Sequence, residues 1–184
     1  MKQPLKYKTK FIAFVAISVD GKISLKAKTP PDWTSPEDWN FLQKSLAKMD
    51  AVIVGRNTYR AAAERLRKRN TFVLSSQIKN IQRRGSVTFI NPQNVGLQDI
   101  LKTYKTVAVL GGGGVYKFML ENNLLDEMFV TIEPLVFGRG KDMVVEGTKT
   151  TKLHLISIRK LNKHGTILIH YKIKHRASAN DCAA

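Results

Sequence analysis

A run of four glycines at residues 111–114 constrains this chain more than any other stretch. It follows the apolar residues 107–110 and precedes an amphipathic segment that begins at Val115. This order predicts a buried strand, a tight turn and a helix. Adjacent glycines are costly in backbone entropy, so the turn needs positive φ angles or a very close neighbour. A phosphate is one such neighbour, because a helix start offers free N–H groups and a positive dipole end; a tight turn without a ligand is the alternative.

The glycine run does not match the dinucleotide fingerprint of Rossmann folds. Tyr116 stands where that fingerprint has its third glycine, and no acidic residue ends a following strand to bind a ribose. If the turn binds a nucleotide, it does so in another fold.

Strong positive charge is the second feature of the sequence. The 184 residues include 31 lysines and arginines against 14 aspartates and glutamates, which gives a net charge of +17. Such a balance favours anionic partners, from nucleic acid to phosphorylated small molecules. The basic residues are not interleaved with aromatics in a nucleic-acid motif, and many lie near the termini or in residues 65–69. A generally basic surface is the favoured interpretation, and we expect no specific nucleic-acid partner.

Length, hydropathy and cysteine usage indicate one domain in a reducing compartment. A hydrophobic content of 43% and a mean hydropathy of −0.21 fit a soluble domain with a sizeable core. The single cysteine, Cys182, allows no disulfide, and the histidines show no ligand spacing, so we expect a cytoplasmic protein without a metal. The apolar run at residues 11–18 is only eight residues long and continues straight into the polar turn at residues 19–22, so we expect a buried strand in place of a signal peptide and no membrane partner.

Apolar runs and turn residues alternate along the chain in the order of an α/β sheet. Continuous apolar runs predict buried strands, and capping residues or glycines mark the helices between them. The expected strands are residues 11–17, 49–55, 71–75, 87–90, 107–110, 126–132, 153–160 and 166–174. The expected helices are residues 36–48, 56–66, 97–104 and one that begins at 115, with loops at 21–31 and 134–140.

This alternation predicts an α/β fold with a mixed sheet of about eight strands. The sheet is expected to be mostly parallel, flanked by helices and closed by a C-terminal antiparallel hairpin. Residues 1–10 are expected to form a basic N-terminal arm, residues 11–174 a single domain and residues 175–184 a polar tail.

Three strand ends are expected to meet at one edge of this sheet. Ligands of such folds bind at the carboxyl ends of strands, beside a change in strand order. The candidate segments are residues 55–58, 74–76 and 110–114. Two helix N-termini, two serines and Arg56 suit a pyrophosphate and one further phosphate, which favours NADPH over NADH. A surface ion pair is the alternative for Arg56, and turn capping is the alternative for Ser75.

The same segments resemble a known family. Residues 50–59 (DAVIVGRNTY), 73–77 (VLSSQ) and 109–116 (VLGGGGVY) resemble dihydrofolate reductase in order and spacing. Residues 18–23 and 124–128, with Pro134, Gly138 and Gly140, resemble the reductase domain of riboflavin biosynthesis, a member of the same superfamily. The resemblance covers about residues 11–174 and implies a fold that binds NADPH.

The resemblance also implies roles for the matching residues. The cofactor would contact Ala16, Ile23, Gly55, Arg56, Asn57, Thr58, Leu74, Ser75, Ser76, Leu110, Gly111, Gly112, Gly113, Gly114, Val115 and Tyr116. The substrate would contact Val15, Leu42 and Thr131. The resemblance further implies a cis peptide bond between Gly111 and Gly112 and, from the riboflavin reductases, a homodimer.

Asp38 and Trp33 are the residues that the resemblance assigns to catalysis. Dihydrofolate reductase carries a carboxylate in its first helix, shortly after a tryptophan, and Trp33, Pro36 and Asp38 match this spacing. A buried acid there would accept hydrogen bonds from two N–H donors of the substrate and assist its protonation. The alternative is that Glu37 and Asp38 are ordinary first-turn residues that interact with the helix dipole.

Two departures from the family patterns leave the substrate open. Gly114 replaces an arginine that is frequent in dihydrofolate reductase, and residues 59–64 replace a loop with Asp-Asp-Pro in the riboflavin reductases. The leading interpretation is an NADPH-dependent oxidoreductase that reduces a pyrimidine or pteridine substrate, like the 5-amino-6-(5-phosphoribosylamino)uracil reductase. A true dihydrofolate reductase, favoured by Trp33 and Asp38, is the second. A basic nucleotide- or RNA-binding module that has lost turnover is the third.

Overall fold

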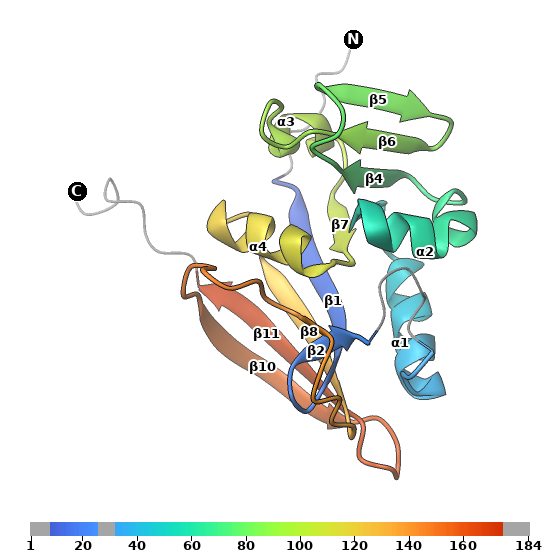
Figure 1. The fold of residues 1–184 in the computed structure, drawn as a ribbon, viewed down its shortest axis with the longest axis vertical. Coiled ribbons are helices and arrows are strands. Elements are labelled where there is room, and N and C mark those ends of the chain that lie inside the picture. Colours follow the sequence, from blue (N-terminus) through green and yellow to red (C-terminus); the bar gives the residue numbers. More distant parts are fainter. Residues whose placement is uncertain (1–7, 26–31, 175–184) are drawn as a thin grey trace, which may run out of the picture.

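The apolar runs of the sequence lie side by side as strands of one nine-stranded sheet (Figure 1). The computed structural model describes residues 8–25 and 32–174 of the chain. In spatial order the strands are β10 (Lys152–Lys160), β11 (Ile167–Lys174), β8 (Glu127–Glu133), β1 (Lys10–Ser18), β7 (Thr106–Val109), β3 (Ala51–Gly55), β4 (Thr71–Leu74), β6 (Val87–Ile90) and β5 (Ile81–Arg84).

Parallel pairing dominates the middle of the sheet, as the sequence predicts. β1 pairs in parallel with β7 and β8, and β7, β3, β4 and β6 continue in the same direction. The C-terminal strands β10 and β11 form the expected antiparallel hairpin, and β11 pairs antiparallel with β8. The predicted α/β fold is therefore confirmed, with nine strands in the main sheet in place of about eight.

Helices cover both faces of the sheet. Within the described residues they are α1 (Pro36–Leu46), α2 (Arg56–Leu66), α3 (Leu97–Leu101) and α4 (Gly113–Glu121). Successive side chains of β1 point to opposite faces, as in any strand. Phe11 and Ala13 pack with residues of α3 and α4 in one apolar core, and Ile12 and Phe14 pack with residues of α1 and α2 in the other. Burial on both faces explains the continuous apolar sequence of this strand.

Three short strands are absent from the sequence prediction. β5 pairs antiparallel with β6 at one edge of the sheet, and all four of its residues are exposed, so no apolar run marks it. β2 (Lys22–Ser24) and β9 (Lys141–Asp142) form a separate two-stranded sheet. The segment expected to be a loop at 21–31 thus begins with a strand, and residues 26–31 lie outside the described part.

The ends of the main sheet can be compared with the predicted domain boundaries. β1 begins at Lys10 and β11 ends at Lys174, close to the predicted domain of residues 11–174. Residues 1–7 of the arm and 175–184 of the tail, with Cys182, lie outside the described residues. The division into arm, domain and tail therefore stays a prediction. No helix in the described ranges is long and apolar enough to cross a membrane.

Candidate active site

One large cavity opens at the carboxyl ends of the parallel strands. Its volume is about 1350 Å³, and its lining runs from the start of α4 to the first turn of α1. Of the residues predicted to bind cofactor or substrate, all but Gly111 line this cavity. They are Val15, Ala16, Ile23, Trp33, Asp38, Leu42, Gly55, Arg56, Asn57, Thr58, Leu74, Ser75, Ser76, Leu110, Gly112, Gly113, Gly114, Val115, Tyr116 and Thr131.

The four glycines form the turn between β7 and α4. The peptide bond between Gly111 and Gly112 is cis, which confirms the expectation from the family resemblance. The N–H of Gly55 donates to the carbonyl oxygen of Gly111 at 2.7 Å and holds the turn beside the start of α2. Gly111 has a φ of +83°, and a Cβ on it would lie 2.6 Å from the ring of Tyr116. The glycine at this position is required by a packed tyrosine rather than by contact with a ligand.

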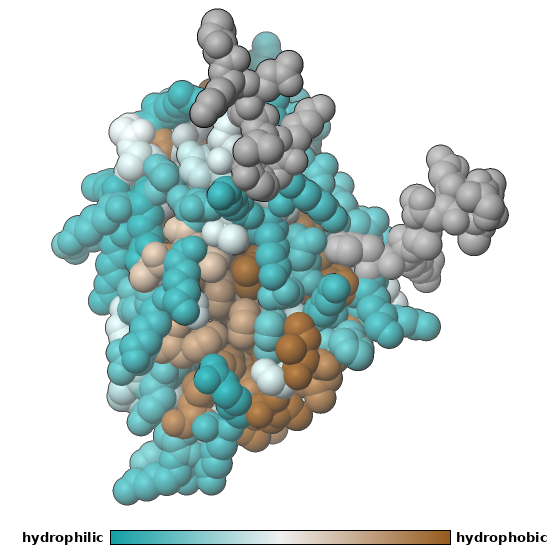
Figure 2. Space-filling view, turned by 180° about the vertical axis from the view of Figure 1, so that it is seen from behind, coloured by the Kyte–Doolittle hydropathy of each residue, from teal (hydrophilic) through white to brown (hydrophobic). Residues whose placement is uncertain are grey.

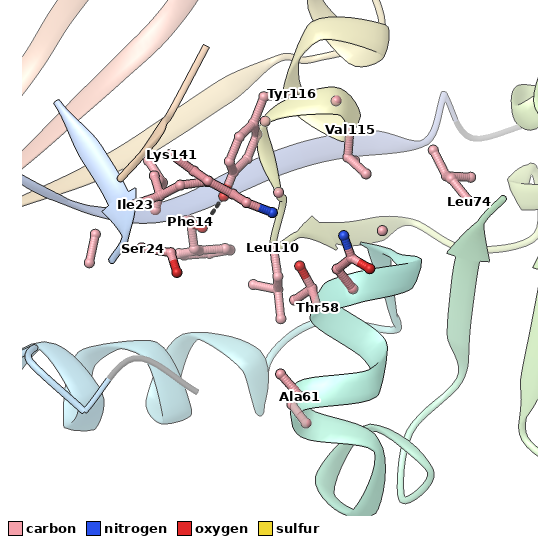
Figure 3. A pocket seen from close by; sticks show the side chains of 18 of the residues that line it. Phe14, Ile23, Ser24, Thr58, Ala61, Leu74, Leu110, Val115, Tyr116 and Lys141 are labelled. Carbon is pink, nitrogen blue, oxygen red and sulfur yellow. Dashed lines mark hydrogen bonds between the residues drawn. The ribbon is translucent and has the colours of Figure 1, made fainter. Parts of the chain in front are cut away.

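Tyr116 supports the glycine turn from within the fold (Figure 3). Its side chain is 1% exposed, and its hydroxyl donates to the carbonyl oxygen of Phe14 at 2.8 Å. Burial raises the pKa of this phenol well above its ordinary value, so the hydroxyl stays neutral. Tyr116 lines the cavity as predicted, but its buried hydroxyl is already bonded to the backbone of β1.

Two helix N-termini open into the cavity without a capping side chain. α2 begins after Gly55 and α4 begins after Gly112, and neither residue has a side chain that could accept from the first N–H groups. Neither helix carries an acid in its first turn. The free N–H groups and the positive dipole ends make this part of the cavity favourable for a phosphate.

Arg56 lies at the same end of the cavity, in the first turn of α2. Its Nη1 atom is the one buried side-chain nitrogen or oxygen of the described residues that has no hydrogen-bond partner. The alternative of a surface ion pair finds no support, because no acid lies within ion-pair distance of Arg56 in the described part of the chain. An unpaired buried guanidinium nitrogen is costly, so these residues fit the phosphates of a nucleotide cofactor.

Ser75 and Ser76 border this end of the cavity after β4. Ser75 is buried, and its Oγ accepts a hydrogen bond from the N–H of Gln77 at 3.2 Å. The turn-capping interpretation of Ser75 is therefore correct. Its hydroxyl can still donate its hydrogen to a ligand oxygen, because a hydroxyl is both donor and acceptor.

The small sheet of β2 and β9 forms a flap over the cavity. Ile23 of β2 and Lys141 of β9 point into the cavity in Figure 3. Lys22 and Asp142 form an ion pair at 2.5 Å that joins the two strands. A Cβ on Gly113 would lie 3.1 Å from the carbonyl oxygen of Asp142, so the flap packs closely against the start of α4. Ile23 is one of the residues predicted from the sequence, whereas Lys141 was not predicted.

Asp38 lines another part of the cavity wall, in the first turn of α1, and is buried, with 7% of its surface exposed. α1 begins as predicted, and the Asp38 N–H donates to the Oγ of the cap residue Ser35 at 3.3 Å. Burial raises the pKa of the Asp38 carboxyl, and the negative charge of Glu133 adds to this effect. Hydrogen bonds to the side chains of Thr131 and Thr34 act in the opposite direction.

The two acids in the first turn of α1 have different surroundings. Glu37 is exposed and accepts a hydrogen bond from the Nδ2 of Asn162 at 3.1 Å. The alternative of an ordinary first-turn residue fits Glu37. Asp38 instead combines burial, a raised pKa and a place in the cavity wall, which are features of a functional carboxyl.

Aromatic and basic side chains complete the Asp38 end of the cavity. The ring of Trp33 packs edge-on against Phe137, with 5.0 Å between centroids. The guanidinium of Arg65 lies 4.6 Å above the ring of Trp39, and Arg69 also lines the cavity. Residues 65–69 were expected to be basic surface, so neither arginine was predicted to line the cavity. The sequence did contain one signal for Arg65: a helix that begins at the cavity also runs along its wall, so later residues of α2 can line it.

Comparisons with known proteins are consistent with this architecture. The family model described as dihydrofolate reductase matches residues 10–137. The chain is 26% identical over 172 residues to the Bacillus subtilis protein YwjB, a match that covers 88% of this chain and 97% of YwjB. The structure of a pyrimidine reductase-like protein from Corynebacterium diphtheriae has a TM-score of 0.74 at 16% identity, over 91% of this chain and 93% of that chain. Dihydrofolate reductase from Enterococcus faecalis, complexed with NADP(H) and RAB-propyl, has a TM-score of 0.68 at 20% identity, over 93% of this chain and 100% of that chain.

At identities of 16% and 20%, the solved structures show that the fold is shared and nothing further. The family model adds a sequence match that spans β1 to the end of β8 and includes Gly55, the glycine run at 111–114 and the ends of β3, β4 and β7. The resemblance to the superfamily found in the sequence is confirmed. The chain belongs to the dihydrofolate reductase family.

Proposed function

We propose that this protein is an NADPH-dependent reductase that reduces a C=N bond in a pyrimidine- or pteridine-type substrate. The observation that carries the proposal is a single cavity with two chemically different ends. One end has two open helix N-termini and the unpaired Arg56, and the other has the buried carboxyl of Asp38. A cofactor rich in phosphate and a ring with N–H donors are the pair of ligands that suits these ends.

NADPH is the cofactor that suits the phosphate-binding end. Arg56 and the two helix N-termini would hold its pyrophosphate and its ribose 2′-phosphate, and Ser75 would donate a further hydrogen bond. A Cβ on Gly112 would meet only Ile23 at 3.8 Å and Thr58 at 4.0 Å, so the bare backbone there is open to a phosphate. When bound, NADPH supplies the hydride. The relative from Enterococcus faecalis complexed with NADP(H) supports this assignment.

Asp38 would bind the substrate ring and supply the proton. Its raised pKa favours the protonated form, which can donate the proton, and the carboxylate that remains can accept hydrogen bonds from two N–H donors on one ring edge. Asp38 would give its proton to the nitrogen of the C=N bond; with the hydride that bound NADPH would supply to the carbon, the product would be a CH–NH group. Trp33, Val15 and Leu42 form walls that align the ring and exclude water.

Arg65 and Arg69 support an anionic group on the substrate beyond its ring. Both side chains line the cavity next to α1: Arg65 lies over the ring of Trp39, the residue after Asp38, and the Nη1 of Arg69 donates to the carbonyl oxygen of Leu46 at the end of this helix. Dihydrofolate carries carboxylates and the phosphoribosylaminouracil carries a phosphate, so both substrates satisfy this requirement. The choice between the two is left to an assay.

Two other functions compete with the leading proposal. A true dihydrofolate reductase is favoured by the spacing of Trp33, Pro36 and Asp38, all of which line the cavity. A nucleotide- or RNA-binding module without turnover is favoured by the net charge of +17. The raised pKa of a buried Asp38 argues against the module, because binding alone gives no reason to keep a costly acid in the cavity.

We also propose that two copies of the chain associate through β10. This strand is an edge of the sheet, all nine of its residues are exposed, and it carries Leu153, Leu155, Ile156 and Ile158 at the surface. Figure 2 shows an apolar area on the lower part of the rear face. An exposed apolar edge strand is a surface that a second strand can cover. Sedimentation velocity over a range of concentrations tests this, and a monomer throughout would contradict it.

A cytoplasmic location remains a proposal from composition alone. It rests on the single cysteine, Cys182, which lies outside the described residues. Labelling of Cys182 in intact cells with a thiol reagent that crosses membranes tests whether the residue is reduced in its own compartment. A protein recovered with Cys182 blocked by oxidation would contradict the proposal.

The experiment that tests the function measures oxidation of NADPH, by its absorbance, in the presence of candidate substrates. The panel contains dihydrofolate and the phosphoribosylaminouracil, with NADH in place of NADPH as the matched control. Oxidation that depends on one of these substrates supports a reductase and identifies the substrate class. NADPH binding without turnover of either substrate would favour the binding module, and no NADPH binding would contradict the proposal.

A further inference from the structure

Glu133, the last residue of β8, is a buried acid that no function assigned above requires. It is 3% exposed and does not line the cavity. One carboxylate oxygen accepts from the N–H of Ser35, the cap residue of α1, at 2.7 Å. The other accepts from the hydroxyl of Thr166, just before β11, at 2.7 Å. Glu133 therefore joins the start of α1 to the ends of two strands.

Glu133 and the cavity residue Thr131 lie on the same face of β8. Side chains two residues apart in a strand point to the same side, and both residues are buried. Thr131 forms a hydrogen bond with Asp38, while Glu133 holds Ser35, three residues before Asp38. The first turn of α1 is thus fixed to β8 at two points, one at the cavity wall and one behind it.

The charge of Glu133 has no counter-ion. No lysine, arginine or histidine lies within ion-pair distance of it among residues 8–25 and 32–174. A buried carboxylate without a cation is costly, and a neutral amide could make similar bonds to Ser35 and Thr166. The negative charge itself therefore calls for an explanation, and the nearby carboxyl of Asp38 provides one.

We propose that Glu133 is a positioning residue for Asp38: it fixes the first turn of α1 and places a negative charge that favours the protonated form of the Asp38 carboxyl. The proposal rests on the proposed function, in which Asp38 supplies a proton. Burial of Asp38 is the larger influence on its pKa, and the charge of Glu133 acts in the same direction. A carboxyl that keeps its proton at higher pH is the better proton donor near neutral pH.

Other charged groups around Asp38 must be separated from Glu133 in any test. They are Glu37 on α1, Asp32 before α1, His164 in the turn before β11, and Arg65 and Arg69, which line the cavity beside α1. Glu37 is exposed and its pKa is lowered, first by its hydrogen bond with Asn162 and also by the charge of His164. The test therefore changes only Glu133 and follows Asp38 directly.

The experiment is an NMR titration of the Asp38 side-chain carboxyl carbon in the protein without substrate or cofactor, with Asp38→Asn used to assign the signal. Glu133→Gln removes the charge and keeps an oxygen for the Ser35 N–H. Its expected effect is a shift of the Asp38 titration midpoint to lower pH. Glu127→Gln is the matched control, because Glu127 is a carboxyl at the other end of β8 that pairs with Lys10 and His170 away from the cavity. An unchanged midpoint in Glu133→Gln, or an equal shift in Glu127→Gln, would overturn the electrostatic role.

Hydrogen exchange of the Ser35 amide tests the positioning role in the same variants. Glu133→Gln should keep the amide protected, and Glu133→Ala should speed its exchange by about tenfold or more, because a bond to a charged acceptor is lost. Equal protection in Glu133→Ala and the unmutated protein would overturn this part. Since neither measurement uses a substrate, the results do not depend on turnover. A negative result in the NADPH assay would contradict the proposed function without deciding the role of Glu133.

Discussion

Replacement of Gly111 by alanine tests the conclusion that this glycine serves packing rather than ligand contact. The new Cβ would lie 2.6 to 2.8 Å from three atoms of the Tyr116 side chain, and the φ of +83° disfavours any residue with a Cβ. The ring has little freedom to move, because it is 1% exposed and its hydroxyl is bonded to the Phe14 carbonyl at 2.8 Å. A left-handed backbone costs about 1–2 kcal/mol and overpacking about 1–3 kcal/mol, so we expect a loss of about 2–5 kcal/mol.

Gly114→Ala is the matched control, three residues along the same run. A Cβ on Gly114 would meet no atom within 4 Å, and the residue lies in α4 without a positive φ. Alanine is favoured over glycine in helices, so the free energy of unfolding should stay unchanged or rise by up to about 1 kcal/mol. Urea unfolding followed by circular dichroism measures both variants. A Gly111→Ala protein as stable as Gly114→Ala would refute the packing argument.

Three further predictions concern the cavity and the turn that precedes β2. Gly112→Ala should weaken NADPH binding with little change in unfolding free energy, because the new Cβ would point into the open cavity. Calorimetry that finds the same NADPH affinity in this variant would contradict a contact between the cofactor and the Gly112 backbone. Asp38→Asn should lower turnover far more than NADPH affinity and remove a titration from the pH–rate profile. Burial raises the pKa of Asp38 in the folded state, so ionisation of this carboxyl lowers stability as pH rises. Asp38→Asn should therefore also unfold at a higher temperature than the unmutated protein at neutral pH, and a lower unfolding temperature would contradict this reasoning. Hydrogen bonds from the Ser18 hydroxyl and from the N–H of Phe137 lower the pKa of Asp20 from 3.8 to about 2. The free energy of unfolding should therefore fall as the pH drops from 3.8 to about 2, and in Asp20→Asn it should depend less on pH over this range.

The sequence predicts the central sheet and its junctions well because their signals are local. Strands buried on both faces give continuous apolar runs, and glycines or helix caps mark where each run ends. The starts of α1 and α2 follow from Pro36 and Gly55 in this way, whereas α4 begins inside the glycine run at Gly113, two residues before the expected start at residue 115. The predicted ligand residues then meet in one cavity because parallel strands bring their carboxyl ends to the same edge.

The missed elements are those whose stability depends on distant partners. β2 and β9 have three and two residues, and they are joined by pairs such as Lys22 with Asp142 that no local pattern reveals. β5 is exposed along its whole length, so it lacks the apolar periodicity of a strand. Glu133 looks like an ordinary charged residue at a strand end, and only the fold brings Ser35 and Thr166 to it.

The central claim is that the Arg56 end of the cavity binds NADPH, and paired affinity measurements test it most directly. Isothermal titration calorimetry of the unmutated protein with NADPH and with NADH compares two ligands that differ by one phosphate. We expect NADPH to bind much more tightly, because Arg56 has an unpaired buried nitrogen and Ser75 can donate a hydrogen bond. Arg56→Ala should narrow the difference by about 1–3 kcal/mol, the range for one charge-assisted hydrogen bond. Equal affinities for NADPH and NADH in the unmutated protein would contradict the account.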